Sequence, residues 1–192
     1  MMAATEPCVI ILAAPSGSGK TSLAKRLLEY FPGAFFSVSA TTRPPRDHER
    51  SGVHYNFISA EAFRDAISAG ELLEYEEVYP DCFYGTLRSE VERSSPQTPI
   101  LLDIDVIGAT KVKAEYGDRC LALFVKAPSL AELEKRLIDR GTETDQSLQI
   151  RIEKASLELT FADEFDHVIV NDRLNRAAEE MIQVVKAFLD SL

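Results

Sequence analysis

The fold is determined by one stretch of sequence, Val9-Ile10-Ile11-Leu12-Ala13-Ala14-Pro15-Ser16-Gly17-Ser18-Gly19-Lys20-Thr21. Its first five residues are apolar and rich in β-branched side chains, which predicts a strand buried on both faces. The next eight nearly match G-x-x-x-x-G-K-[ST], the phosphate-binding loop (P-loop) that joins a strand to a helix. Just beyond it, Leu23, Leu27 and Leu28 share one helical face. We therefore predict a strand, a phosphate-binding loop and a helix in that order.

The chemistry of this loop points to a nucleoside triphosphate. Glycines let backbone N–H groups turn inward around a phosphate, and the start of the helix adds free N–H groups and a positive dipole end. Lys20 is then expected to bridge the β- and γ-phosphates, and the Thr21 hydroxyl to bind Mg²⁺. We expect ATP at Ala14, Pro15, Ser16, Gly17, Ser18, Gly19, Lys20 and Thr21. Ala14 replaces the first glycine of the pattern, and the plain alternative is a glycine-rich turn with an exposed lysine.

Further apolar runs alternate with helical patterns along the rest of the chain. The predicted strands are 35–38, 100–104, 121–125 and 168–170, and the predicted helices include 130–138 and 174–189. Leu130, Leu133, Leu137 and Ile138 are expected to share a helix face. Ser129 with Glu132 forms a capping box before that helix, and Gly141 is a plausible C-cap. This alternation predicts an α/β fold with a parallel sheet covered on both faces.

Two segments interrupt the alternation. Residues 41–97 are polar and aromatic and contain several glycines and prolines, so we expect an inserted lobe with short strands and one helix at 61–68. Residues 140–145 are polar and are expected to form a hinge between two helices.

Composition limits the possible partners. The 192 residues carry a formal net charge of −10, so nucleic acid and anionic membranes are poor candidates. No apolar run reaches the roughly 18 residues that span a bilayer, and the N-terminal residues lack the pattern of a signal peptide. Three cysteines without C-x-x-C spacing argue against a disulfide framework or a zinc site. We expect a cytoplasmic protein whose oligomeric state is open.

A carboxylate for the metal is expected at a second strand end. Leu101-Leu102-Asp103-Ile104-Asp105 is an apolar strand that ends in aspartate, and this is the Walker-B pattern. Asp103 is therefore the expected second Mg²⁺ ligand, although an aspartate at this place can also be a turn residue.

Two groups of arginines stand out in the acidic background. The first is Arg43, Arg46 and Arg50, where prolines stiffen the loop and guanidinium groups are suited to bind phosphate bidentately. The second is Arg136, Arg140 and Arg151. A kinase with two phosphorylated substrates needs two such groups. The plain alternative for the first group is a solvated loop, and the alternative for the second is salt bridges to Glu132 or Glu143.

These residues together resemble the guanylate kinase family from about Val9 to Leu189. The matching stretches, in order, are 14–21, Phe36-Ser37-Val38-Ser39-Ala40-Thr41-Thr42-Arg43, Gly52-Val53-His54-Tyr55-Asn56-Phe57, Phe83-Tyr84-Gly85-Thr86, Leu102-Asp103-Ile104-Asp105, Arg140-Gly141-Thr142-Glu143 and Val168-Ile169-Val170-Asn171-Asp172. The resemblance implies one domain over 1–192. Its parts are a P-loop core (7–38, 98–136, 156–192) with a five-stranded parallel sheet, a GMP-binding lobe (39–97) and a helical lid (about 137–155).

The resemblance also implies the reaction and its residues. The reaction is transfer of the γ-phosphate of ATP to GMP with Mg²⁺, giving ADP and GDP. By position, the GMP phosphate is held by Ser39, Arg43, Arg46, Tyr55 and Tyr84. Guanine is read by Glu74 and Thr86, with Asp105 close by. Asn171 lies beside adenine. The implied catalytic residues are Lys20, Arg43, Arg136, Arg140 and Arg151, the last three at the lid and the ATP phosphates.

The chemistry of guanine supports this assignment. Its N1–H and 2-amino groups are adjacent donors that one carboxylate accepts, and adenine would leave a buried Glu74 unpaired. Two alternatives remain. One is a binding module that has lost catalysis, and the other is a P-loop kinase for another small acceptor.

Overall fold

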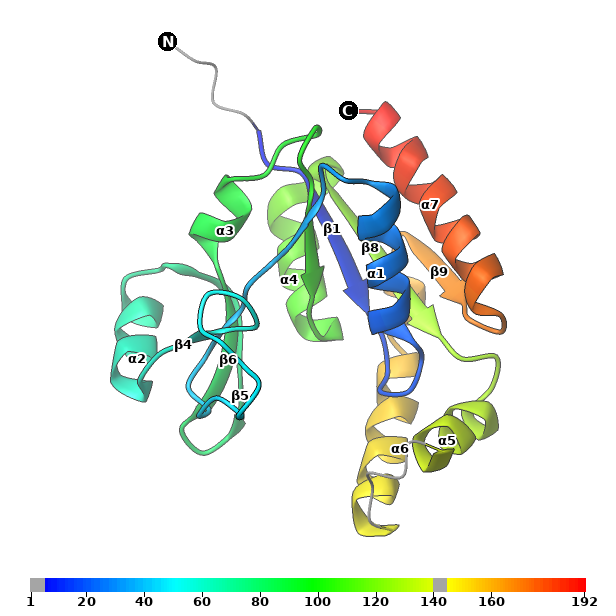
Figure 1. The fold of residues 1–192 in the computed structure, drawn as a ribbon, viewed down its shortest axis with the longest axis horizontal. Helices are drawn as coiled ribbons and strands as arrows, with labels where there is room; N and C mark the ends of the chain where they lie inside the picture. The colour runs from blue at the N-terminus through cyan, green and yellow to red at the C-terminus, as the bar shows by residue number, and fades with distance from the viewer. Residues whose placement is uncertain (1–5, 140–144) are drawn as a thin grey trace.

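The computed structural model describes residues 6–139 and 145–192. Its core is a five-stranded sheet in the order β2-β7-β1-β8-β9, in which every neighbouring pair is parallel (Figure 1). The strands are β1 (Val9–Ala13), β2 (Phe35–Phe36), β7 (Ile100–Asp103), β8 (Cys120–Lys126) and β9 (His167–Val170). The α/β fold and the parallel sheet predicted from the sequence are confirmed.

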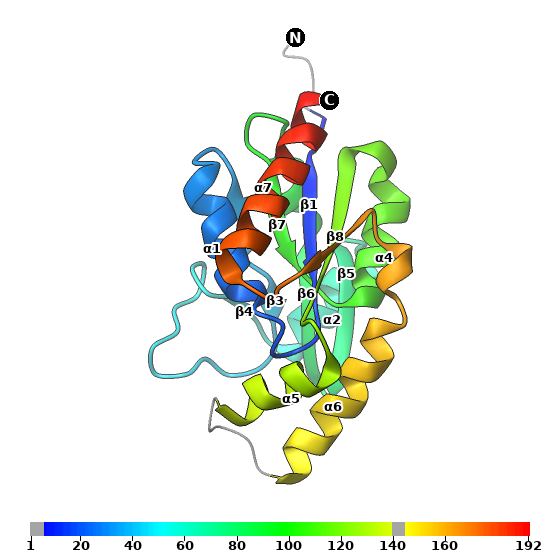
Figure 2. The same ribbon diagram turned by 90° about the vertical axis from the view of Figure 1, so that its right-hand side faces the viewer.

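Helices cover both faces of this sheet (Figure 2). Alternate residues of β1 face opposite sides: Ile10 and Leu12 pack with α1 (Lys20–Tyr30) and α7 (Leu174–Asp190), whereas Val9 and Ile11 pack with α4 (Val106–Tyr116). Because both faces are covered, the five strands show no polar alternation, and polar residues such as Asp103 and Lys126 occur in them only at strand ends.

Two of the core strands are shorter than predicted. β2 ends at Phe36, two residues before the expected end at Val38, and β7 ends at Asp103. Ser37 N still donates to Leu101 O (2.9 Å), after which the chain leaves the sheet for the inserted lobe. Asp103, the last residue of β7, lies at the edge of the sheet where the carboxyl ends of the parallel strands meet.

The inserted segment forms its own four-stranded sheet in the order β4-β3-β6-β5. Its elements are β3 (Ala40–Thr41), β4 (Asn56–Phe57), α2 (Ala60–Ser68), β5 (Leu72–Tyr79), β6 (Cys82–Leu87) and the short helix α3 (Arg88–Glu92). Phe63 of α2 stacks on Phe83 of β6 with ring centroids 5.1 Å apart. Both rings belong to a small hydrophobic core that is separate from the core of the main sheet. The predicted helix at 61–68 is confirmed, and α3 was not predicted.

The helices α5 (Leu130–Asp139) and α6 (Asp145–Leu159) form the third part of the molecule and lie below the core sheet in the view of Figure 1. Leu133, Leu137 and Ala155 are buried between them. Ser129 Oγ accepts from Glu132 N (3.1 Å), so the predicted N-cap is confirmed. Of the four residues predicted to share a helix face, Leu133 and Leu137 are buried, whereas Leu130 and Ile138 are 37% and 55% exposed. Gly141 lies outside the described residues.

The remaining elements are two short 3₁₀ turns, Gly117–Arg119 and Ala162–Glu164. Within the described part of the chain, no helix has both the length and the apolar character needed to cross a membrane. Cys8 and Cys120 are buried in the core.

Candidate active site

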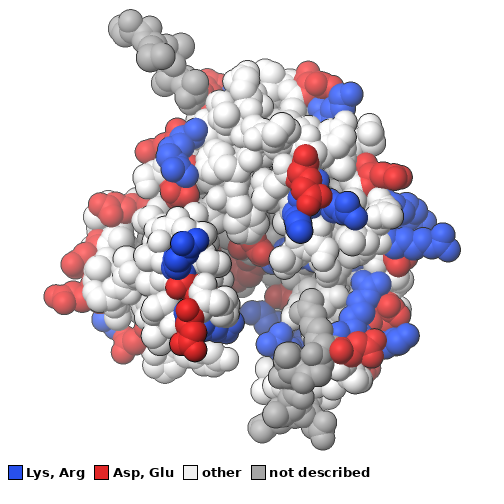
Figure 3. Space-filling view, in the orientation of Figure 1, with Lys and Arg blue, Asp and Glu red and all other residues white. Residues whose placement is uncertain are grey.

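A cavity of about 740 Å³ lies between the core, the inserted lobe and α6. Its walls come from the P-loop, the ends of β2 and β7, the facing side of β5 and β6, and one face of α6. Figure 3 shows the hollow between the two lower lobes of the molecule, with acidic atoms in its depth and basic atoms beside it. The strand ends of a parallel sheet are a usual place for a ligand in α/β folds.

The P-loop adopts the backbone that its glycines predict. Gly17 and Gly19 have φ values of 93° and 89°, in the left-handed region that favours glycine. Asn171 at the end of β9 donates from its side-chain Nδ2 to Ser18 O (2.8 Å), and a side chain at Gly19 would collide with that amide. Ala14, by contrast, does not have a positive φ. The missing first glycine therefore creates no backbone strain.

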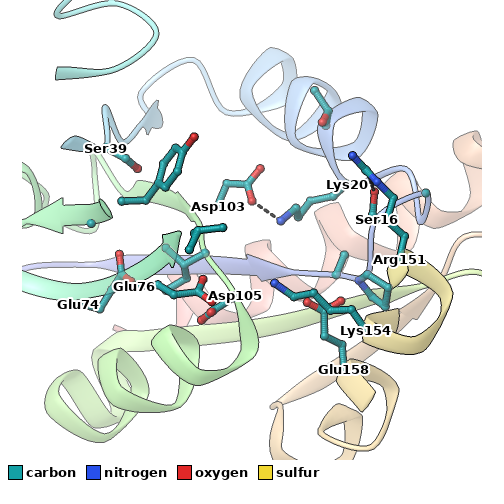
Figure 4. A pocket seen from close by; sticks show the side chains of 18 of the residues that line it. Ser16, Lys20, Ser39, Glu74, Glu76, Asp103, Asp105, Arg151, Lys154 and Glu158 are labelled. Atoms are coloured by element: carbon teal, nitrogen blue, oxygen red, sulfur yellow. Dashed lines mark hydrogen bonds and ion pairs between the residues drawn. The ribbon is translucent and has the colours of Figure 1, made fainter. Parts of the chain in front are cut away.

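Lys20 and Asp103 form an ion pair at the end of the cavity nearest the P-loop (Figure 4). Thr21 lines the same cavity one residue further along α1. A hydroxyl and a carboxylate are hard oxygen ligands that suit Mg²⁺, which is usually held by one or two carboxylates together with substrate phosphates. Among the residues that the structure describes, no cluster of three or more His, Cys, Asp or Glu side chains is arranged to hold a metal.

Arg43 is the centre of a network in the inserted lobe. Its guanidinium donates to both oxygens of Glu49 at 2.7 Å and, through Nε, to the Tyr84 hydroxyl at 3.0 Å. It also lies over the rings of Tyr55 and Phe57, 5.1 and 5.5 Å from their centroids. The hydrogen bonds from Arg43 lower the pKa of Glu49 to about 2, and those to Glu49 raise the pKa of Arg43. The guanidinium is therefore held in one orientation.

Arg46 belongs to the same loop but makes a different contact. Its backbone N donates to Glu49 (2.8 Å), and its side chain is exposed. The structure thus places Glu49 between the two arginines. The sequence analysis did not single out Glu49, because nothing in the spacing of the loop shows which carboxylate folds back on Arg43.

Glu74 and Thr86 are cross-strand neighbours on β5 and β6. Thr86 Oγ1 donates to Glu74 Oε1 at 2.7 Å, and both side chains are buried. Burial raises the pKa of Glu74, and the hydrogen bond from Thr86 opposes that rise. Asp105 stands nearby as the N-cap of α4, where its Oδ1 accepts from Gly108 N (2.6 Å). A buried carboxylate with one free oxygen is suited to accept a pair of donors from a ligand.

The residues of the second arginine group do not all lie in the same place. Arg151 on α6 lines the cavity and donates to Ser16 Oγ of the P-loop (2.9 Å). Arg136 on α5 contacts Glu132 Oε1 and Asn171 O, both at 3.0 Å, and is not among the cavity-lining residues. The salt bridge considered as the alternative for Arg136 is therefore present. Arg140 lies outside the described residues.

The cavity brings together most of the residues expected from the sequence. Those that line it are Ala14, Pro15, Ser16, Gly17, Gly19, Lys20, Thr21, Ser39, Tyr55, Glu74, Tyr84, Asp103, Asp105 and Arg151. Six of the expected residues are not part of the cavity lining: Ser18, Arg43, Arg46, Thr86, Arg136 and Asn171. Three of these are joined to the lining or to the P-loop by hydrogen bonds: Arg43 to Tyr84, Thr86 to Glu74, and Asn171 to Ser18.

Three charged residues of the cavity were missed. Glu76 on β5 and Lys154 and Glu158 on α6 all point into it (Figure 4). Burial is the main cause that raises the pKa values of Glu76 and Glu158; a hydrogen bond between the side chains of Glu76 and Asp105 contributes next for Glu76. The alternation of a strand could have identified Glu76, which lies two residues beyond Glu74.

Comparisons with known proteins point to one family. A family model described as guanylate kinase matches residues 6–188. A guanylate kinase of Salinibacter ruber is 55% identical over 183 residues, covering 95% of this chain and 97% of that protein. One of Bacteroides fragilis is 48% identical over 185 residues, covering 96% and 91%. A crystal structure of guanylate kinase from Anaplasma phagocytophilum aligns with a TM-score of 0.73 at 29% identity, covering 95% of this chain and 86% of that one.

Proposed function

The chain belongs to the guanylate kinase family, and we propose that its cavity carries out transfer of the γ-phosphate of ATP to GMP. The observation that carries this proposal is the pairing of two different sites across one cavity. A P-loop with Lys20 forms one wall, and the Glu74–Thr86 pair with the Arg43 network forms the other. The first suits a triphosphate, and the second suits a guanine base joined to a phosphate.

On the ATP side, the P-loop residues 14–21 bind the phosphates. The backbone N–H groups around Gly17 and Gly19 and at the start of α1 are suited to bind phosphate oxygens. Lys20 would lie across the β- and γ-phosphates, and Arg151, which donates to Ser16 Oγ from α6, would reach the same place. Asn171 holds the loop through Ser18 O, and we expect adenine beside it, as the family resemblance implies.

On the GMP side, the inserted lobe reads both ends of the nucleotide. Arg43, Arg46, Tyr55, Tyr84 and Ser39 hold the phosphate, with tyrosine hydroxyls adding neutral donors. Glu74 accepts from guanine N1–H and the 2-amino group, Thr86 turns its hydroxyl hydrogen from Glu74 to O6, and Asp105 lies beside them. The hydrogen bond that Thr86 makes to Glu74 in this structure positions the carboxylate for this role.

Transfer needs positioning and charge neutralisation but no general base. GMP is largely dianionic at neutral pH because the second pKa of a phosphate monoester is about 6. Its oxygen can therefore attack the γ-phosphorus in line without losing a proton. The negative charge that develops on the transferred phosphoryl group is balanced by five basic side chains, Lys20, Arg43, Arg136, Arg140 and Arg151. Thr21 and Asp103 would hold Mg²⁺, which would neutralise further charge on the triphosphate.

We also propose which part of the domain carries each role. Residues 7–38, 98–136 and 156–192 form the core, 39–97 the GMP-binding lobe and about 137–155 the lid. The small-molecule partners are ATP and GMP, and we place the protein in the cytoplasm because its three thiols are free and its substrates are cytoplasmic metabolites.

The test is a coupled ADP-release assay with ATP and Mg²⁺ against GMP, AMP, UMP and CMP in parallel. We expect turnover with GMP and little with the other three. Turnover with a different nucleotide would retain the P-loop kinase but contradict the roles of Glu74 and Thr86. Folded protein that binds GMP without any turnover would instead indicate a binding module.

A further inference from the structure

Glu76 is a charged cavity residue to which the proposed reaction assigns no role. It lies two residues beyond Glu74 on β5 and directly opposite Tyr84 on β6. Glu74 is likewise opposite Thr86, so the four side chains form two cross-strand pairs on the same face of the sheet. Glu74, Glu76 and Tyr84 all line the cavity.

The two pairs are spaced to match a nucleotide. Residues two apart on a strand are separated by about 6.5 to 7 Å. The Glu74–Thr86 pair stands at the guanine end, and Tyr84 reaches the phosphate end, where its hydroxyl accepts from Arg43. A base and a phosphate joined by a sugar therefore place the sugar next to Glu76.

Glu76 lies in a part of the cavity that is rich in carboxyl oxygens. Its carboxyl meets that of Asp105, and Asp105 uses Oδ1 for the cap of α4 (Figure 4). Carboxyl oxygens act mainly as acceptors, so neighbouring hydroxyl groups of a ligand are suited to donate to them. The 2′- and 3′-hydroxyls of a ribose are such a group. Lys154 extends from α6 toward the two carboxyls and reduces the net negative charge there.

We propose that Glu76 accepts a hydrogen bond from the ribose 2′-hydroxyl of the acceptor nucleotide and so favours GMP over dGMP. This proposal rests on the proposed function, because it needs the guanine and phosphate ends placed as described above. It makes Glu76 a specificity residue for the sugar, separate from the residues that read the base.

The test compares kcat/KM for GMP and dGMP in the full chain and in Glu76→Ala and Glu76→Gln. We expect the unmodified protein to prefer GMP by about tenfold or more, the size expected for one hydrogen bond to a charged group. Glu76→Ala should bring the ratio close to one by lowering the GMP value and leaving the dGMP value. Glu76→Gln keeps an acceptor oxygen and should retain an intermediate ratio. Glu71→Ala, an exposed position before β5, is the control.

Two results would overturn the assignment. One is equal use of GMP and dGMP by the unmodified protein, and the other is an equal loss for both nucleotides in Glu76→Ala. If the protein phosphorylated neither nucleotide, the proposed function would be wrong. Calorimetric binding of GMP and dGMP to the same variants would then still test Glu76, with the same ratios expected.

Discussion

Lys20 in the first turn of α1 forms an ion pair with Asp103 at the end of β7. The two residues are far apart in sequence, but β1 and β7 are neighbouring parallel strands whose carboxyl ends lie side by side. In the proposed reaction Lys20 serves the phosphates and Asp103 serves Mg²⁺. The pair therefore marks the place into which the γ-phosphate and the metal must fit.

Replacing Lys20 with alanine should reduce kcat by about 100- to 1,000-fold, the loss typical of one preorganised charge at a transition state. The matched control is Lys25→Ala, because Lys25 lies five residues further along α1 with a side chain that is 79% exposed. The ADP-release assay measures both variants. Retention of more than a tenth of the activity by Lys20→Ala would contradict its role at the phosphates.

Glu74→Gln should lower kcat/KM for GMP by about 100-fold, since the amide presents donors to the guanine donors and leaves buried groups unpaired. The variant should also lose its preference for GMP over AMP. Glu77→Gln is the control, because Glu77 lies on the same strand and accepts a turn hydrogen bond from Asp81 N that glutamine can keep. Unchanged GMP turnover in Glu74→Gln would exclude the guanine-reading role.

The fold could be predicted closely because its core strands are apolar on both faces and are separated by helical patterns. The end of β2 and the burial of Ile138 were mispredicted for different reasons. At Val38 the apolar pattern continues after the chain has left the sheet. At Ile138 an apolar residue occupies the edge of a helix face that the partner helix does not cover.

The candidate site was predictable only where a local pattern carries the chemistry. The P-loop, the strand end at Asp103 and the arginines that stand out in the acidic background are such patterns, whereas the other residues of the inserted lobe came from the family resemblance. Glu49, Lys154 and Glu158 were not predicted because their roles depend on tertiary contacts: Glu49 folds back on Arg43, and α6 turns one face to the cavity. Single charged residues in a loop or a helix do not show which partner they meet.

Ala14→Gly should leave kcat and both KM values within about twofold of the unmodified protein. The structure gives the reason, because Ala14 has no positive φ and glycine is not required there. Glycine should instead lower the free energy of unfolding by up to about 1 kcal/mol through the greater freedom of the unfolded chain. Kinetics with thermal or urea unfolding check both statements. A large gain in activity would show that Ala14 restricts the phosphate loop.

Guanosine binding should weaken with acid at a higher pH than an ordinary glutamate predicts. Burial raises the pKa of Glu74, and only its carboxylate can accept both guanine donors, so affinity is full above the raised pKa and is lost as the pH falls through it. Guanosine is the better probe than GMP because it has no phosphate that titrates near pH ~6. Calorimetric titrations across acidic pH give the profile.

The same shift predicts the opposite trend for stability. A carboxyl whose pKa is raised by folding binds its proton more tightly in the folded state, so its contribution is present below the usual glutamate pKa and declines as the pH rises through the raised value. Relative to Glu74→Gln, the unmodified protein should therefore lose unfolding free energy over the pH range in which it gains affinity for guanosine. Urea unfolding of both proteins at matched pH values measures this difference. If the two curves stayed parallel while guanosine affinity still changed, another group would control the binding, because a single titrating carboxyl must appear in both measurements.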